Sequence, residues 1–188
     1  MPQNAAATDF LRTRRSHPPK TLTGPAPDRA ELMDMLTLAA RVPDHGKIEP
    51  WRFVVLERAT LNRLAPILAQ FVLTNGGMQA DADKAASAFA SPVIVGVVSA
   101  PIEHKVPAWE QNLSAGAVCL SLVNAALAAG YGASWLSGPA TKGAFAQQHL
   151  GLAENEKLVG LIHIGTPGAT PVPDRPRPDI STKTTFLP

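Results

Sequence analysis

Apolar residues recur at helical spacing in several stretches of the chain. The clearest stretch begins at Asp28, which forms a capping-box pattern with Glu31 three residues later. Four apolar positions then fall on one face of the helix that this pattern predicts: Leu32, Met35, Leu36 and Ala39. This helix is expected to stop at Pro43. An earlier helix is expected to be capped by Thr8 and to run through Arg14.

More helices and strands are predicted further along the chain. The helices cover residues 59–73, 80–90, 109–129 and 141–150. Buried strands are expected over residues 53–56 and 93–98, and residues 93–98 are too apolar on both faces to form a sheet edge. Two further strands are expected over residues 133–136 and 157–164. Because strands and helices do not alternate regularly, an α+β sheet layered with helices fits better than a doubly wound parallel sheet.

The domain organisation is expected to be simple. The sequence contains no evident internal repeat or second domain, so residues 1–188 are expected to form a single domain. From Pro167 onward the chain is rich in proline and cannot fold on its own. Residues 167–188 are therefore expected to form an extended C-terminal arm.

Residues 109–129 form the most apolar of the predicted helices. The stretch carries almost no charge after Glu110, and small residues over 114–117 permit close packing on all sides, so we expect the central helix of the core. Asn124 and the break at residues 130–132 favour a buried helix over a membrane span. The single cysteine, Cys119, lies in this helix and is interpreted as a packing residue, because a buried thiol is inert.

Composition and charge make some classes of binding partner less expected than others. The chain has 17 Lys and Arg residues against 15 Asp and Glu, which gives no general electrostatic reason to expect nucleic acid or an anionic membrane as a partner. One cysteine excludes an intramolecular disulfide and is compatible with a reducing compartment. Residues 1–8 lack the apolar core of a secretory signal, so a cytoplasmic location is the simplest expectation.

Standard catalytic motifs are mostly missing from the sequence. It has no G-x-G-x-x-G after a strand, no Walker loop and no G-x-S-x-G elbow. Asp44, His45 and Glu49 are of the types that bind metals, but they lie in a proline-flanked loop with no second histidine nearby, so no metal site is predicted. His163 lies in an apolar strand and is expected to be a hydrogen-bonded core residue.

The group Arg14-Arg15-Ser16 indicates a ligand-binding site more strongly than these histidines and carboxylates do. Guanidinium groups and a hydroxyl suit a phosphate and its attached polyol. The alternative is that the arginines only complement the C-terminal end of a helix dipole. Arg175 and Arg177 in the arm are either a second anion contact or solvated charges.

Several segments together resemble a known family. They are residues 14–16, residues 40–45 (ARVPDH) running into 50–53 (PWRF), residues 104–111 (HKVPAWEQ) with 114–116 (SAG), residues 130–138 (GYGASWLSG), and residues 157–160 (KLVG) through 165–167 (GTP). In this order and at this spacing they resemble the flavin nitroreductase family, in particular its compact bacterial branch. The resemblance spans almost the whole chain.

The resemblance implies an architecture, a cofactor and the residues that bind it. The expected α+β fold has a central, mostly antiparallel sheet with helices on both faces, and forms a homodimer that binds two FMN molecules at its interface, with the C-terminal tail exchanged over the neighbour. Arg14, Arg15 and Ser16 would hold the flavin phosphate and ribityl chain. Arg41 and His45 would reach the same FMN from the other subunit. The isoalloxazine would be lined by Trp135, Leu136 and Ser137.

The resemblance also implies the activity. FMN would pass electrons from NADH or NADPH to nitroaromatic or quinone-like acceptors by a ping-pong mechanism, with no catalytic side chain of the protein required. A nicotinamide contact is implied along one segment: Ala125, Ala126, Leu127, Ala128, Ala129 and Gly130. The alternatives are an FMN store or sensor with little turnover, another flavin reaction on the same fold, and an interaction module that uses the tail.

Two positions depart from the family pattern. Lys47 stands roughly where larger nitroreductases carry Asn, so flavin contacts there are expected to differ. Leu136 stands where close relatives carry Arg, and the loss of that cation predicts a flavin that is harder to reduce. Lys47, Lys142 and Arg175 are candidates to replace the missing charge.

Overall fold

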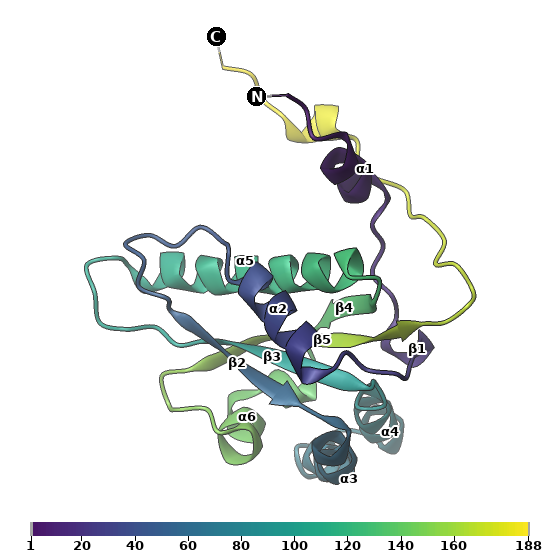
Figure 1. Cartoon of the computed structure of the whole chain (residues 1–188). Helices are drawn as coiled ribbons and strands as arrows, with labels where there is room; N and C mark the ends of the chain where they lie inside the picture. Colours follow the sequence, from purple (N-terminus) through teal and green to yellow (C-terminus); the bar gives the residue numbers. More distant parts are fainter. Residues whose placement is uncertain (1, 188) are drawn as a thin grey trace.

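A computed structural model describes residues 2–187 of the chain (Figure 1). The helices are α1 Ala5–Thr13, α2 Arg29–Ala39, α3 Arg58–Thr74, α4 Gln79–Ala88, α5 Ala108–Ala128 and α6 Gly143–Leu150. The strands are β1 Leu22–Thr23, β2 Trp51–Leu56, β3 Val93–Ser99, β4 Gly132–Leu136 and β5 Lys157–Pro167. Short 3-10 turns cover Pro19–Thr21, Pro139–Thr141 and Ile180–Lys183.

The strands form one antiparallel sheet organised around β5. This strand pairs with β3 along one side, with β4, and with the short β1 at its C-terminal end, while β3 also pairs with β2. The sheet confirms the expected α+β fold and the interior position of β3, whose residues are all buried. The expectation of a buried strand at residues 53–56 was wrong in part, because β2 ends the sheet and only its last residue, Leu56, is buried.

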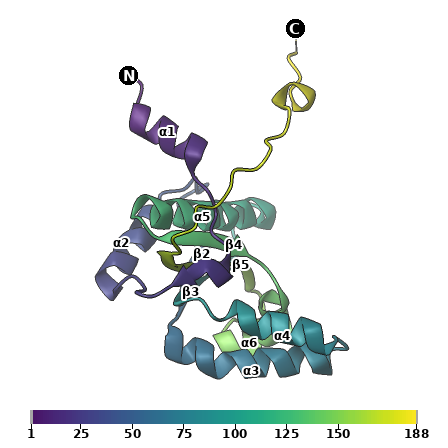
Figure 2. The ribbon, with the colours of Figure 1, turned by 90° about the vertical axis from the view of Figure 1, so that its right-hand side faces the viewer.

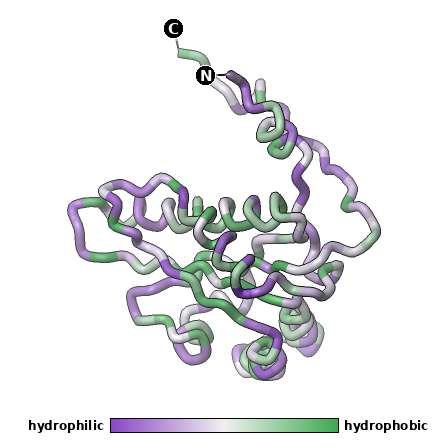
Figure 3. Tube along the Cα trace, viewed as in Figure 1, coloured by the Kyte–Doolittle hydropathy of each residue, from purple (hydrophilic) through white to green (hydrophobic). Residues whose placement is uncertain are grey.

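Two helical layers cover the sheet. Alternate side chains of β3 point to opposite faces, so Ile94 and Val98 pack with α3, α4 and α6 whereas Val95 and Val97 pack with α2 and α5. Figures 1 and 2 show the two helical layers on opposite sides of the strands. Apolar residues run through the strands between the layers, and the loops at the edge of the molecule are mostly polar (Figure 3).

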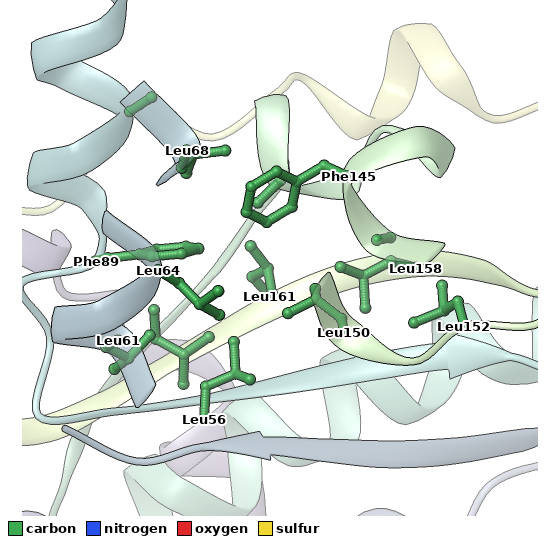
Figure 4. Close-up of a cluster of buried hydrophobic side chains, with 14 of the residues drawn as sticks. Leu56, Leu61, Leu64, Leu68, Phe89, Phe145, Leu150, Leu152, Leu158 and Leu161 are labelled. Carbon is green, nitrogen blue, oxygen red and sulfur yellow. The ribbon is translucent and has the colours of Figure 1, made fainter. Parts of the chain in front are cut away.

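On the side of the sheet covered by α3, α4 and α6, the core contains fully buried aromatic rings. Phe145 of α6 is fully buried and meets Phe71 of α3 edge to face, with ring centroids 5.4 Å apart. Phe89, Leu64 and Leu161 complete this cluster between α3, α6 and the sheet (Figure 4). The cluster fixes the position of the chain that joins β4 to α6.

Helix α5 is buried on one face only. Val118, Cys119 and Leu122 pack on the sheet and on α2, whereas Trp109 and Leu113 remain more than 60% exposed. The expectation of close packing on all sides is therefore wrong within one chain. By length and composition α5 would pass as a membrane span, but half of its apolar window is buried, as in the core helix of a globular protein.

Several element boundaries differ from the sequence expectation. Helix α1 begins at Ala5 rather than Thr8, because the side chain of Asn4 accepts a hydrogen bond from the Ala7 amide at 3.1 Å and caps the helix earlier. The predicted capping box at Asp28 and Glu31 is confirmed, with both hydrogen bonds formed.

The bounds of three later elements also differ from those predicted from the sequence. Helix α2 ends at Ala39, before Pro43, and α6 begins at Gly143 because residues 139–141 form a separate 3-10 turn. Strand β5 continues past residue 164 to Pro167, because β1 and β4 pair with its last residues.

Helix α1 and the tail after β5 project from the body beyond the α5 layer (Figures 1 and 2). Helix α1 buries no residue, and the tail after β5 remains almost entirely exposed over its described length. Phe186 is 91% exposed. These segments contribute little to the core of their own chain.

Phe145→Ala should reduce the free energy of unfolding by about 3–5 kcal/mol, because it removes a buried ring and leaves a cavity between α3 and α6. Met78→Ala, at an exposed position beside α4, should change it by less than about 0.5 kcal/mol. Urea denaturation followed by circular dichroism measures both values. Similar losses for the two variants would contradict the assignment of Phe145 to the core.

Candidate flavin site

A cavity of about 550 Å³ lies on the α3, α4 and α6 side of the sheet. Its walls come from the C-terminal half of α3, from α4, from the segment 136–140 after β4, and from β5. Most of the lining is apolar, and its charged side chains are Asp81, Lys84 and Lys142. An apolar cavity with few polar groups is typical of a site for a flat organic ligand.

Strand β4 connects this cavity with the other predicted flavin residues. Leu136 and Ser137 line the cavity. The side chain of Trp135 does not, because alternate residues of a strand point to opposite faces and its indole lies over Gly160. Trp135 can therefore serve the cavity only through its backbone.

The segment 14–17 runs beside β4. The His17 amide donates a hydrogen bond to the Ala133 carbonyl at 2.9 Å, which holds the segment against the strand. Arg14 Nε is buried and has no hydrogen-bond partner, and Arg14 Nη2 is 3.5 Å from Ser16 Oγ. A buried, unpaired guanidinium N–H next to a hydroxyl suits an anionic group such as a phosphate.

Other features of this segment agree with an anion site. Burial, together with the positive charges of Arg15 and Arg177, lowers the pKa of Arg14 from its usual value. An anion between these arginines would offset their repulsion. His17 Nδ1 and Ser134 Oγ are also buried without partners, so three of the unsatisfied polar atoms found among the described residues gather around β4.

Arg15 is engaged by the C-terminal tail. Its Nε donates a hydrogen bond to the Pro173 carbonyl at 3.2 Å and lies 3.7 Å from Asp174 Oδ1. The same Asp174 oxygen accepts a hydrogen bond from Arg177 at 2.9 Å. Arg14 and Ser16 thus remain for an anion, while Arg15 holds the tail.

Arg41 and His45 lie at the other end of the molecule. They belong to the loop 40–50, beside the N-terminal end of α5, whereas β4 follows the C-terminal end of this helix (Figure 1). The 21 residues of α5 span about 30 Å. One chain therefore does not bring Arg41 and His45 to Arg14 and Ser16.

The loop that carries His45 has an unusual backbone. Lys47 and Glu49 adopt positive φ angles of 53° and 48°, which non-glycine residues rarely do. Ser114 on α5 fixes both ends of the loop: its hydroxyl donates to the Pro43 carbonyl at 2.9 Å and accepts from Trp51 Nε1 at 3.2 Å. The Glu49 amide also donates to Asp44 Oδ2 at 2.8 Å.

The sequence did not reveal two features of these sites. His45 Nδ1 lies 2.7 Å from Glu110 Oε2 on α5, a contact between residues 65 positions apart. Lys84 joins Lys142 in the lining of the cavity beside Leu136. Of the three cations considered as replacements for Arg at position 136, only Lys142 lines this cavity, whereas Lys47 and Arg175 do not.

The predicted nicotinamide segment, residues 125–130, lies at the C-terminal end of α5. Ala125 and Ala126 are buried, and Gly130 follows the helix with φ 87°. The segment does not line the cavity. A helix C-terminus carries partial negative charge, which does not favour a pyrophosphate, so this contact stays a prediction.

Two buried titratable groups are structural. His163 Nδ1 is 2.9 Å from Ser91 Oγ, which confirms a hydrogen-bonded core histidine, and burial lowers its pKa to about 4. Burial raises the pKa of Cys119 to about 12, which confirms an inert packing thiol. Neither group is suited to nucleophilic chemistry.

Comparison with known proteins identifies the family. The sequence model described as Nitroreductase family matches residues 11–166. The Escherichia coli K12 protein named "Putative NAD(P)H nitroreductase YdjA" is 37% identical over 163 residues, which cover 86% of this chain and 88% of that protein. The chain belongs to the nitroreductase family.

Solved structures show the same nitroreductase fold. A nitroreductase-like family protein from Bacillus cereus superposes with a TM-score of 0.80 at 22% identity, covering 100% of this chain and 98% of the other. A nitroreductase with bound FMN from Bacteroides fragilis superposes with a TM-score of 0.74 at 17% identity, covering 98% and 100%. At these identities the likeness concerns the fold.

His163 should make the protein sensitive to acid. Its pKa of about 4 in the folded state lies below the usual 6.5, so the unfolded state binds the extra proton first and stability falls as pH drops from 6.5 towards 4. The loss between pH 7.5 and 4.5 should be about 2–3 kcal/mol. Urea denaturation at both pH values should show a smaller loss for His163→Gln and an unchanged loss for His104→Gln; equal losses would contradict this role.

Proposed function

We propose that this nitroreductase-family protein is an FMN-dependent oxidoreductase that transfers electrons from NAD(P)H to nitroaromatic or quinone-like acceptors. The observation that carries the proposal is the buried, unpaired Arg14 Nε beside Ser16, on a segment that runs along β4 next to an apolar cavity. The family and the names of its relatives support the oxidoreductase activity and both cofactors.

The residues present fit FMN. Arg14 and Ser16 would hold the phosphate through charge-assisted hydrogen bonds, and the Arg15 contact would keep the tail beside it. Leu136 and Ser137 would present the wall of the cavity to the ring system. When bound, FMN supplies the electron-transfer chemistry, and the protein orients the reactants and excludes water.

The exposed face of α5 supports a homodimer. Trp109, Leu113 and Leu120 lie on this face, with the small residues Gly116 and Ala117 between them. A two-fold axis that crosses the helix near Gly116 would pair two copies of the face in antiparallel orientation. The arrangement would bury apolar side chains and let the helices approach closely.

Such a dimer would also complete the site. Antiparallel packing of α5 would bring the N-terminal end of one helix, with Arg41 and His45, towards β4 and Arg14 of the partner. The two halves of the predicted site, separated by about 30 Å in one chain, would then face one FMN. Each dimer would have two such sites, with the tail from residue 167 reaching over the neighbour.

The reaction would follow a ping-pong course in the cytoplasm. NAD(P)H and the acceptor would use the same space in turn, because the cavity of about 550 Å³ has a mostly apolar lining and the buried Cys119 thiol is not suited to a covalent step. The contact along residues 125–130 would orient the nicotinamide cofactor.

The purified protein should be a yellow dimer whose colour is bleached by NADH or NADPH without oxygen and restored by a quinone. Light scattering and anaerobic absorbance spectra measure these properties. A colourless monomer in excess FMN would refute the proposal, and a yellow protein that is not bleached would indicate a store or sensor. Leu113→Arg should yield monomers that lose FMN, whereas Met78→Arg, exposed on the other side of the sheet, should retain both dimer and FMN.

Leu136→Arg should raise the midpoint potential of the bound flavin, because a cation at the cavity wall stabilises the reduced anion. Each tenfold gain in relative binding of the reduced form corresponds to about 30 mV for a two-electron couple. Lys142→Ala should lower the midpoint potential, and Leu136→Met should leave the midpoint potential unchanged. An anaerobic titration against a reference dye measures all three, and no rise for Leu136→Arg would contradict the charge argument.

A further inference from the structure

His45 and Glu110 form a paired acid and base outside the cavity. His45 Nδ1 is 2.7 Å from Glu110 Oε2, and the side chain of His45 is 64% exposed whereas that of Glu110 is 29% exposed. The carboxylate favours the tautomer with the proton on Nδ1. Nε2 is then the nitrogen that remains for a reactant.

The loop presents this imidazole in a fixed position. Its two positive-φ residues, Lys47 and Glu49, are the only non-glycine residues of this kind in the described part of the chain. Ser114 ties down both ends of the loop, and Asp44 holds it internally. Backbone strain that the surroundings hold in place is found most often at functional sites.

The surroundings leave Glu110 as the partner of this histidine. On the same loop, the Asp44 carboxylate accepts from the Glu49 amide, and Lys47 and Glu49 lie in the left-handed region of the backbone. On the neighbouring segment, the ring of His104 lies beside Gly46 and its Nδ1 accepts from the Val106 amide at 3.2 Å. Within residues 2–187, the ion pair found for His45 is the one with Glu110.

We propose that His45, positioned by Glu110, donates a proton to the acceptor when that acceptor is reduced. The inference rests on the proposed function, because the antiparallel dimer brings this pair to the flavin site of the partner. His45 would contact the acceptor and act as a general acid. Glu110 would be a positioning residue that acts through the imidazole.

The chemistry requires this proton. Reduction of a quinone to its hydroquinone takes two electrons and two protons: a hydride from the reduced cofactor forms one O–H bond, and a proton must form the second. The Nε2–H bond of the imidazolium breaks as that second O–H bond forms, leaving a neutral imidazole that keeps its proton on Nδ1 and donates it in a hydrogen bond to Glu110 Oε2. Water then returns the proton to Nε2.

The test compares two acceptors with FMN-loaded, dimeric enzyme in stopped-flow experiments. A quinone needs a proton, whereas ferricyanide accepts electrons only. His45→Gln should slow reoxidation by the quinone about 100-fold more than it slows reoxidation by ferricyanide or reduction by NAD(P)H. Glu110→Gln should slow the quinone reaction less and alter its pH profile. His104 is a nearby histidine with no carboxylate partner among residues 2–187, so His104→Gln should behave as wild type.

The pH profile gives a second readout. The donor in this step is a protonated imidazole, so the quinone rate of wild-type enzyme should depend on pH, and that dependence should be lost in His45→Gln. Equal slowing with both acceptors, or an unchanged pH profile in His45→Gln, would overturn the inference and leave the pair as a loop anchor. A wild-type protein that is colourless or monomeric in excess FMN would instead refute the proposed function.

Discussion

The double-sided burial of β3 and β5 is the constraint on which the rest of the structure depends. Both strands are apolar on both faces, so each face of the sheet must be covered by helices. Helices α2 and α5 cover one face, and α3, α4 and α6 cover the other. The long α5 therefore lies across the sheet and separates the loop 40–50 from β4, and the cavity forms on the opposite face where α4 meets the segment after β4.

The same constraint explains why the site is divided. A helix that covers a sheet buries one face and leaves the other to solvent, and on α5 the outer face carries the exposed apolar side chains of Trp109, Leu113 and Leu120. When the exposed face of α5 packs against a second copy of the chain, the same step would complete the flavin site. Cofactor binding and subunit association should then be thermodynamically linked, because each stabilises the other.

Local patterns in the sequence predicted much of the fold. The apolar run of β3, the capping box at Asp28 and the periodic face of α2 each depend on residues close together in the chain, and all three are present. Burial of β2 was overestimated because an apolar run does not reveal which strand ends the sheet. The site was predicted less completely: contacts such as His45 with Glu110, or Lys84 beside Leu136, arise from chain folding and have no sequence spacing of their own.

The separation of Arg14 and His45 along α5 has a genetic consequence. In a mixed dimer of one chain defective at Arg14 and one defective at His45, one site would collect both defects and the other would collect neither. The mixed dimer would therefore have half the activity of the normal dimer, and two inactive alleles expressed together and pairing at random would restore about a quarter of normal activity. Two alleles with lesions in the same half of the site would show no such complementation.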